Sequence, residues 1–218
     1  MLNMLDYSIR IDERDFYSAC NRELLNVVSQ AISSTIKKTR NEYIQIIKNC
    51  LRNDPDQTYD ALCGGLLRAD LGLEDGCSEA EQVVEYIANS IELRKLSGTS
   101  KTLGGLKVVV LRSGIEPILD MPFASYVSNG HEIPWLKWLL TSGSEIVVAN
   151  YSVIYGSDFP TSRTGQAIMG KKKTGGGGFR IRGEHAGTPN VNWVTKALLL
   201  CAESKIIEKM EASLSEFK

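Results

Sequence analysis

The segments IPWLKWLL (residues 133–140) and EIVVANYSVIY (residues 145–155) stand close together in the chain, separated by TSGS. Pro134 suits the first turn of a helix and Gly143 suits its end, which predicts a helix over 135–141. The second segment is rich in β-branched and aromatic residues, which predicts one long strand. A helix followed directly by a strand indicates a mixed fold.

Downstream of this pair, the sequence predicts one more strand and a last helix. Phe179 and Ile181 alternate with Arg180 and Arg182, which is the pattern of a strand with one apolar face. The segment TPN (residues 188–190) then begins a helix that runs from 191 to about 214 and repeats apolar residues at helical spacing.

Upstream, the first hundred residues are mainly helical in pattern. Apolar residues recur every three or four positions over 12–51, which predicts a long amphipathic helix that ends before Pro55. Such a helix lies across a sheet or packs against a partner. Further helices are predicted over 57–71 and, with Ser78 as the cap, over 78–96. The run LKVVVL (residues 106–111) predicts a strand, and 115–119 predicts a short return strand or a loop.

These elements predict an α+β fold, in which long N-terminal helices and a C-terminal helix pack on a small, mostly antiparallel sheet. We expect a helical N-terminal part over 1–97. An α+β core over 98–218 follows, and it carries a basic, glycine-rich hairpin loop. The chain has 218 residues with 43% hydrophobic composition, which is enough for a real core.

The composition excludes several kinds of site. The five cysteines are odd in number and lack C-x-x-C spacing, so we expect reduced thiols rather than a disulfide framework or a zinc site. With two histidines, we expect no metal site and no cofactor. Residues 1–10 show no signal-peptide pattern, and no apolar run approaches the roughly 20 residues of a membrane span. We therefore expect a protein made in a cytoplasm, with no membrane contact.

Three short patterns in the sequence resemble parts of catalytic sites, and none predicts an enzyme. The loop GKKKTGGGG (residues 170–178) places its lysines before the glycines and precedes a strand, which is unlike a phosphate-binding loop. Ser34 to Lys37 and Lys173 to Gly175 match short elements of penicillin-binding enzymes, but no S-D-N element lies between them. Glu184 and His185 are a candidate acid–base pair, but a surface histidine in a glycine-bounded turn explains them better, and no serine or cysteine nucleophile is marked. A hydrolase that uses this pair ranks third, after a structural subunit and a nucleic-acid-binding module.

Charge is divided between two segments of a chain whose net charge is −1. Residues 74–92 hold six carboxylates and no lysine or arginine, whereas residues 156–183 hold six cations against Asp158 alone. The cations are Arg163, Lys171, Lys172, Lys173, Arg180 and Arg182. This pattern fits head-to-tail contact between copies, contact with a phosphate backbone, or a solvated hairpin tip. Trp135 and Trp138 share a helical face, which suits core packing or an interface centre.

The segments from Trp135 to Leu140, from Ser162 to Met169 and from Phe179 to Arg182, with AGT (residues 186–188) ahead of NWVTKA (residues 192–197), resemble neck and tail-completion proteins of tailed bacteriophages. The similar families are the minor tail protein Z type and its relatives among small tail-component proteins. The resemblance covers 133–218. The chain departs from the family pattern at Arg182-Gly183, where a proline is usual, and in its run of four glycines.

The resemblance implies a non-enzymatic structural subunit that forms an oligomeric ring at the neck or the top of the tail. Its partners would be copies of itself, other neck or tail proteins, and double-stranded DNA in the channel. It would be made in the host cytoplasm and reside in the virion. The eight residues named above as cations and tryptophans would then contact a neighbour or DNA. A baseplate subunit and a nucleic-acid-binding module using 163–182 remain the alternatives.

Overall fold

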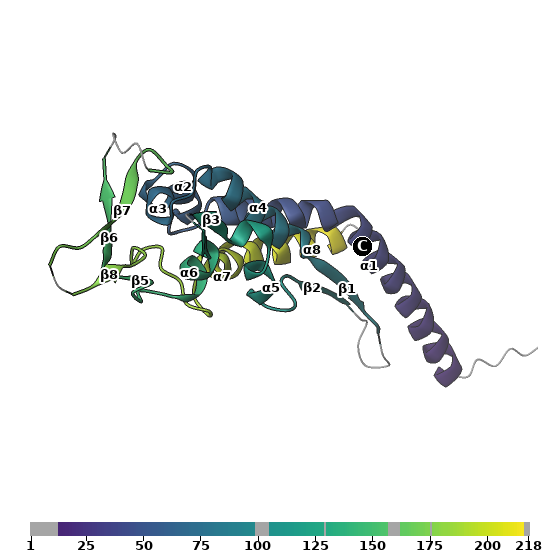
Figure 1. Cartoon of the computed structure of the whole chain (residues 1–218). Coiled ribbons are helices and arrows are strands. Elements are labelled where there is room, and N and C mark those ends of the chain that lie inside the picture. Colours follow the sequence, from purple (N-terminus) through teal and green to yellow (C-terminus); the bar gives the residue numbers. More distant parts are fainter. Residues whose placement is uncertain (1–12, 99–104, 129, 157–161, 175, 216–218) are drawn as a thin grey trace, which may run out of the picture.

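A computed structural model describes residues 13–98, 105–128, 130–156, 162–174 and 176–215. The predictions for residues 1–10, for Asp158 and for most of the loop before Gly105 concern residues outside these ranges. The chain combines helices with short antiparallel strand pairs, which confirms the predicted α+β class. Figure 1 shows an elongated molecule, with the strands of the basic segment at one end and the start of the first helix at the other.

Helix α1 (Glu13–Arg52) is the longest element, and it continues through 37–40 without a break. Its inner half, from Ala31 onward, buries a face that includes Tyr43, Ile47 and Leu51. Its outer half extends away from the body (Figure 1) and keeps large apolar side chains exposed. The amphipathic pattern therefore continues beyond the part of the helix that the body covers.

The helix predicted over 57–71 is two helices, α2 (Thr58–Cys63) and α3 (Leu66–Leu71). Gly64 and Gly65 separate them, and a Cβ atom on Gly65 would lie 2.8 Å from the Ala61 Cα atom. A side chain at this position is therefore excluded by close packing. The glycine pair ends α2 after Cys63, whereas the apolar pattern alone predicted one helix through this point.

The helix predicted over 78–96 ends earlier than expected. Helix α4 (Gly76–Asn89) is capped by Asp75, whose side chain accepts a hydrogen bond from the Ser78 amide at 3.1 Å. After it, β1 (Glu92–Leu96) pairs antiparallel with β2 (Gly105–Val109). The strand β1 was missed because its charged residues lack an alternating apolar pattern, whereas β2 confirms the predicted strand.

The middle of the chain is irregular apart from one predicted helix. Short helical turns, α5 (Glu116–Leu119) and η1 (Pro122–Ala124), replace the return strand proposed for 115–119. The hairpin of β3 (Tyr126–Ser128) and β4 (His131–Ile133) follows. Helix α6 (Trp135–Thr141) then confirms the expectation that Pro134 precedes a helix.

The long strand predicted over 145–155 is divided at Asn150, which has a positive φ of 61°. This left-handed backbone ends β5 (Val148–Ala149) and turns the chain into β6 (Tyr151–Tyr155). The two short strands find different partners. Strand β5 pairs with β8 (Gly178–Phe179), and β6 pairs with β7 (Ala167–Lys171). The strand predicted over 179–182 is therefore reduced to Phe179 and the preceding glycine.

The last helical region begins at Asn192, whose side chain forms a reciprocal capping box with Thr195. Helix α7 (Trp193–Ala197), the π-helical turn η2 (Leu198–Ala202) and α8 (Glu203–Ser215) follow one another directly. The capping box begins the helix at Trp193, whereas the sequence predicted a start at residue 191.

One hydrophobic core contains side chains from both predicted parts of the chain. It includes Leu51 and Ile87 from the N-terminal helices as well as Trp135, Phe179 and Trp193. Trp193 donates from Nε1 to the Leu51 carbonyl at 2.9 Å, so the last helix is held against the end of the first. The predicted division near residue 97 therefore does not divide the core.

The cysteine prediction is corrected by the structure. Cys50 of α1 is bonded to Cys201 of η2, and Cys63 of α2 is bonded to Cys77 of α4, whereas Cys20 is free and exposed. These pairs are 151 and 14 residues apart in sequence, so spacing gave no sign of their proximity. Each bond joins two helices that already pack together.

Counting accessible thiols tests this pairing. Protein purified without reductant and denatured in iodoacetamide should gain one adduct per chain, on Cys20, whereas reduced protein should gain five. Intact mass and peptide mapping measure both values. Five adducts without reductant would contradict the disulfides, and retention of the native circular dichroism spectrum after reduction would show how far the fold needs them.

Candidate interaction surface

The basic loop, defined as Lys171 to Gly177, lies at the end of the molecule formed by β5 to β8. Asn150 holds both sides of it: its carbonyl accepts from the Lys172 amide at 2.9 Å, and its amide donates to the Gly177 carbonyl at 3.2 Å. The left-handed turn at Asn150 makes both backbone groups available. One residue therefore sets the position of the loop.

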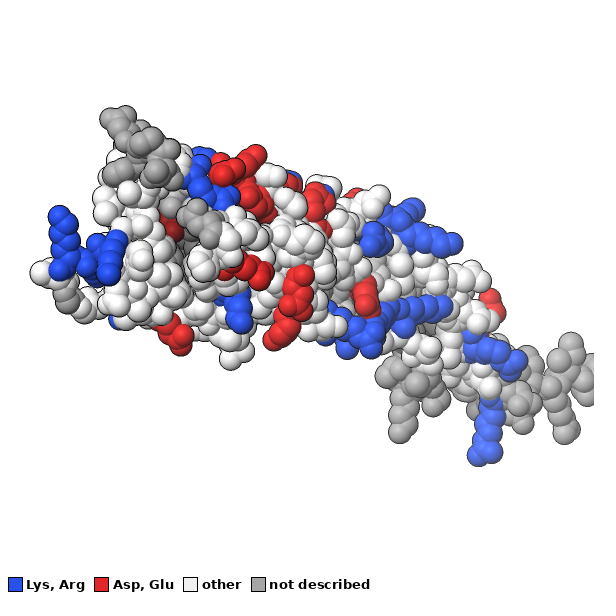
Figure 2. Space-filling view, viewed as in Figure 1, with Lys and Arg blue, Asp and Glu red and all other residues white. Residues whose placement is uncertain are grey.

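Lysine side chains project into solvent from this loop. Lys171, Lys172 and Lys173 are all exposed, as is the nearby Arg180. Figure 2 shows blue side chains at this end of the molecule, beyond the white surface of the strands. None of these four cations forms an ion pair among the described residues. They are available to a neighbour or to a phosphate backbone.

Arg163 belongs to a different environment from the lysines. Its guanidinium carbon lies 4.0 Å from the centroid of the Tyr126 ring, and its Nε atom lies 3.3 Å from a Glu74 carboxylate oxygen. The side chain is thereby held between β3 and the turn before α4. Arg163 therefore joins two parts of the same chain, and its charge interacts with groups inside the fold.

Arg182 is also used within the chain. Its Nε atom donates to Asp70 Oδ2 at 2.8 Å, and its Nη2 atom donates to the Tyr155 hydroxyl at 2.8 Å. The Asp70 side chain is only 3% exposed, and burial raises its pKa although Arg182 opposes the shift. Asp70 Oδ1 has no hydrogen-bond partner in the described part of the chain. Arg182 is therefore the group that compensates a buried carboxylate and holds β6 near α3.

The two tryptophans have separate roles. Trp135 is fully buried, and its Nε1 atom donates to the Phe123 carbonyl at 2.8 Å. Trp135 is therefore a core residue. Of its two predicted roles, core packing and the centre of an interface, it has the first. Trp138 is half-buried, with its ring centroid 6.4 Å from that of Phe179.

The acidic segment is largely paired within the chain. Glu81 accepts from Arg52 Nε at 3.1 Å and from the Tyr59 hydroxyl at 2.9 Å, and the hydrogen bond from Arg52 lowers its pKa. Glu85 pairs with Lys48. Glu74 pairs with Arg163, and Asp75 caps the start of α4. Few carboxylates therefore remain for the predicted head-to-tail charge contact. In Figure 2, blue groups lie beside some of the red ones, whereas other red groups lie on white surface.

A cleft of about 530 Å³ separates the β6–β7 pair from α3 and β3. Its lining combines aromatic, apolar and charged side chains. Among them are Asp70, Tyr126, His131, Trp138, Tyr151 and Arg163. The volume is within the range of small-molecule sites. Across the described ranges, no three His, Cys, Asp or Glu residues are grouped to hold a metal ion.

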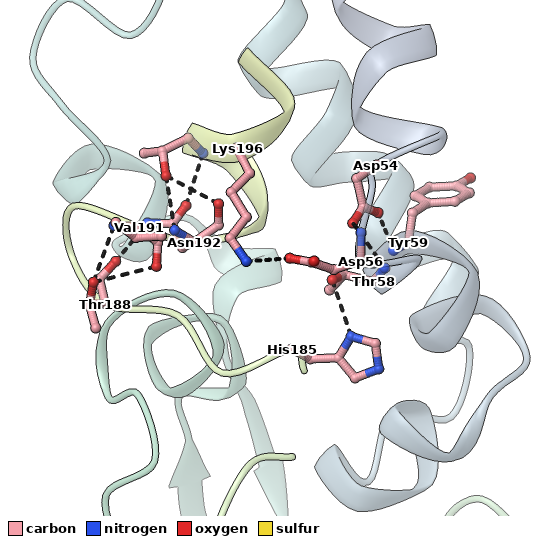
Figure 3. Close-up of polar contacts among 10 residues, drawn as sticks. Asp54, Asp56, Thr58, Tyr59, His185, Thr188, Val191, Asn192 and Lys196 are labelled. Carbon is pink, nitrogen blue, oxygen red and sulfur yellow. Dashed lines mark hydrogen bonds and ion pairs between the residues drawn. The ribbon is translucent and has the colours of Figure 1, made fainter. Parts of the chain in front are cut away.

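His185 lies in a polar network that joins the loop after Arg182 to the α1–α2 turn (Figure 3). His185 Nδ1 is 3.2 Å from Thr58 Oγ1, and its Nε2 atom is 3.7 Å from Glu184 Oε1. This order of hydroxyl, imidazole and carboxylate resembles a hydrolytic triad in its connectivity. Thr58 is only 1% exposed, however, so its hydroxyl is shielded from any substrate.

The same network has a clear structural role. Asp54 accepts hydrogen bonds from the amides of Asp56, Thr58 and Tyr59 at 3.0 to 3.1 Å, which orders the turn and begins α2. Lys196 of α7 pairs with Asp56 across the interface, as Figure 3 shows. Burial lowers the pKa of His185, which favours its neutral form. The network holds the C-terminal segment against α1 and α2 without an accessible nucleophile.

Comparison with protein-family models, curated proteins and solved structures finds no match for this chain. The resemblance to phage proteins therefore remains a prediction from the sequence. Among the described residues, no helix has the length and apolar character needed to cross a membrane.

Sequence reasoning missed two features that matter for interaction. The amphipathic pattern of α1 did not reveal that its outer half leaves the body, where Phe16, Leu24 and Val27 are exposed. The positive φ of Asn150 was also missed, although asparagine is one of the few residues that adopt this conformation. The available sequence signal for this break was Asn150 itself, a polar residue within the apolar run 146–154.

Replacing Arg182 with alanine should reduce the free energy of unfolding by about 1–3 kcal/mol, because a buried carboxylate loses its partner. Arg180→Ala is the matched control, since Arg180 is exposed and forms no ion pair with the described residues, and it should change stability by less than about 0.5 kcal/mol. Urea unfolding monitored by circular dichroism measures both. Equal losses in the two variants would contradict the role assigned to the Asp70–Arg182 pair.

The network of Figure 3 predicts a pH dependence. Because the pKa of His185 is lowered in the folded chain, the unfolded chain binds more protons as pH falls through the ordinary histidine value near about 6.5. The stability from neutral His185 is complete above that value and is lost below it. Between pH 7.5 and 5.0, His185→Gln should therefore lose less unfolding free energy than the unmodified protein.

The same substitution at exposed His131 is the control for this measurement. Urea unfolding at both pH values gives the comparison directly. If His131→Gln and His185→Gln alter the pH dependence equally, the buried position of His185 is not its cause.

Proposed function

We propose that this chain is a structural subunit of a tailed bacteriophage, which assembles into an oligomeric ring at the neck or the top of the tail. The observation that carries the proposal is the outer half of α1, which leaves the body and exposes an apolar face. The likeness of 133–218 to tail-completion proteins supplies the class of assembly. Its roles would be tail completion, head–tail joining and passage of DNA.

The exposed face of α1 supports assembly rather than a solitary molecule. Phe16 is 53% exposed and Tyr17 is 64% exposed, and Leu24 and Val27 lie further along the same half of the helix. A contiguous patch of large, exposed apolar side chains usually marks a site that binds another molecule. A helical segment that packs little against the described residues also gains most of its stability from contact with a partner.

The basic loop supports a second contact at the opposite end of the molecule. Its lysines form no ion pair with the part of the chain that the structure describes, and they lie on a glycine-rich segment, so they fit the acidic surface of another protein or the phosphates of duplex DNA in a channel. Arg163 and Arg182 are excluded from this role because they are engaged within the chain. Trp135 is excluded by burial, and Trp138 retains only its half-buried edge.

A nucleic-acid-binding module is the second candidate function, and the same free cations favour it. It differs from the ring in needing no contact between copies. A baseplate or other tail position would use the same surfaces with different neighbours.

The disulfides bear on where the subunit would mature. A bacterial cytoplasm keeps thiols reduced. A virion protein made there would carry Cys50, Cys63, Cys77 and Cys201 as adjacent thiols, and dioxygen would oxidise each pair to a disulfide once the cell is opened, by lysis or during purification. The bonds then stabilise the finished particle, typically by about 2–4 kcal/mol each.

Light scattering and negative-stain imaging of the purified protein at high concentration test the ring. The expected result is a mass that is a multiple of the monomer and closed rings with a central hole. A strict monomer that binds duplex DNA would contradict the ring and favour the second candidate.

Changing Lys171, Lys172 and Lys173 to glutamate tests the basic loop. If the loop contacts DNA, salt titration should show weaker binding and a slope of log K against log salt that is smaller by about 2.7, for three lost phosphate contacts. If it contacts a neighbour, assembly should fail while DNA binding is unchanged. The triple change of exposed Lys37, Lys137 and Lys205 to glutamate is the control for total charge, and an equal effect would contradict a local role.

A further inference from the structure

The two disulfides lie in different surroundings. Cys50 is 1% exposed and belongs to the hydrophobic core, and Cys201 packs against that core. Cys77, by contrast, is exposed in the first turn of α4, and its Sγ atom lies 4.0 Å from the Tyr59 hydroxyl. Its partner Cys63 is half-buried. A thiol that reduces a disulfide must reach one of the two sulfurs, so access favours attack at Cys77.

The exposed bond holds the junction between two short helices. Helices α2 and α3 have six residues each, and Gly64 and Gly65 lie between them. Helices of this length have little stability of their own and depend on packing against the rest of the fold. Cys63 is the last residue of α2 and directly precedes the glycine pair. Its bond to Cys77 therefore ties this junction to α4.

Helix α3 in turn carries contacts to the strand end of the molecule. Asp70 accepts a hydrogen bond from Arg182 Nε at 2.8 Å, and Arg182 also donates to the Tyr155 hydroxyl of β6. The Leu71 carbonyl accepts from the Tyr126 hydroxyl of β3 at 2.6 Å. The end of α3 also lines the cleft beside the β6–β7 pair. The position of α3 therefore determines how these strands rest on the helical body.

We propose that the Cys63–Cys77 bond is a redox-sensitive switch. A dithiol reduces it ahead of the Cys50–Cys201 bond, and its reduction loosens α3 and, with α3, the attachment of the strands to the helical body. The buried bond stays intact and keeps the first and last helices joined. The chain would thus have a tighter form under oxidising conditions and a looser form under reducing ones. This inference does not depend on the proposed ring.

The step is an ordinary thiol–disulfide exchange. A thiolate of the dithiol attacks Cys77 Sγ, the bond between the two protein sulfurs breaks, and Cys63 leaves as a thiolate that takes a proton from water. The second thiol of the reductant then displaces Cys77 and closes the disulfide of the reductant. Two electrons pass from the dithiol to the protein, which gains two thiols. A disulfide of the same class reverses the step.

Timed reduction tests which bond is attacked first. The full chain is treated with a low concentration of dithiothreitol, quenched with iodoacetamide at intervals and analysed by peptide mapping. Cys63 and Cys77 should be alkylated at least about tenfold faster than Cys50 and Cys201, because of their access. Cys20 is alkylated at every time and gives the reference signal. Equal rates for the two pairs, or faster reduction of the buried pair, would overturn the inference.

Hydrogen exchange tests what the reduction changes. The amides of Gly72 and Leu73 donate at 3.1 Å to the carbonyls of Ala69 and Arg68 at the end of α3. When only the exposed pair is reduced, these amides should exchange roughly 10- to 100-fold faster, because the short loop loses its cross-link. The amides of residues 43–51 in α1 should not change. Unchanged exchange at the end of α3 would contradict the switch, and so would an equal rise in both regions.

A pair of double variants gives the matched control. Cys63→Ser with Cys77→Ser should show fast exchange at Gly72 without reductant and no further response to it. Cys50→Ala with Cys201→Ala retains the exposed pair, so its exchange should still rise on reduction. Slow exchange in the serine variant, as in the oxidised chain, would refute the inference. Circular dichroism checks that each variant is folded, and the measurements on the unmodified chain decide the inference without either variant.

Discussion

The packing of the last helix against the end of the first is the constraint on which the rest of the structure depends. The Trp193 indole donates to the Leu51 carbonyl, and Cys50, the residue before Leu51, is bonded to Cys201. These contacts fix the ends of the core. Helix α4 then packs on the same inner half of α1 through Lys48–Glu85 and Arg52–Glu81 pairs. The outer half keeps Phe16, Tyr17, Leu24 and Val27 exposed.

The strand end of the molecule is positioned by a buried charge. Asp70 on α3 is compensated by Arg182, and Arg182 also reaches Tyr155 on β6. Asn150 then sets where the basic loop leaves the strands. The arrangement separates two kinds of cation, since the arginines join parts of one fold while the lysines remain in solvent. The distinction comes from position, because their chemistry alone would suit either use.

The sequence predicted the helices with strong apolar periodicity and the proline-led helix α6, since these depend on local pattern. It did not predict β1, whose residues Glu92 to Leu96 become a strand only because β2 lies beside them. The disulfides and the Asp70–Arg182 pair depend on contacts between distant parts of the chain, and no spacing reveals them. The same holds for the candidate surface, where the lysines were predictable as exposed charges and the internal roles of Arg163 and Trp135 were not.

The bond between Cys50 and Cys201 has a mechanical consequence. The two sulfurs are 151 residues apart in sequence, so the bond encloses most of the chain in a covalent loop. A pulling force applied to α1 reaches η2 and α8 through this bond without loading the hydrogen bonds and apolar contacts of the enclosed segment. The strand pairs and the small helices are thereby shielded from tension. Tension is therefore carried by α1, the disulfide, η2 and α8, and the other elements do not bear it.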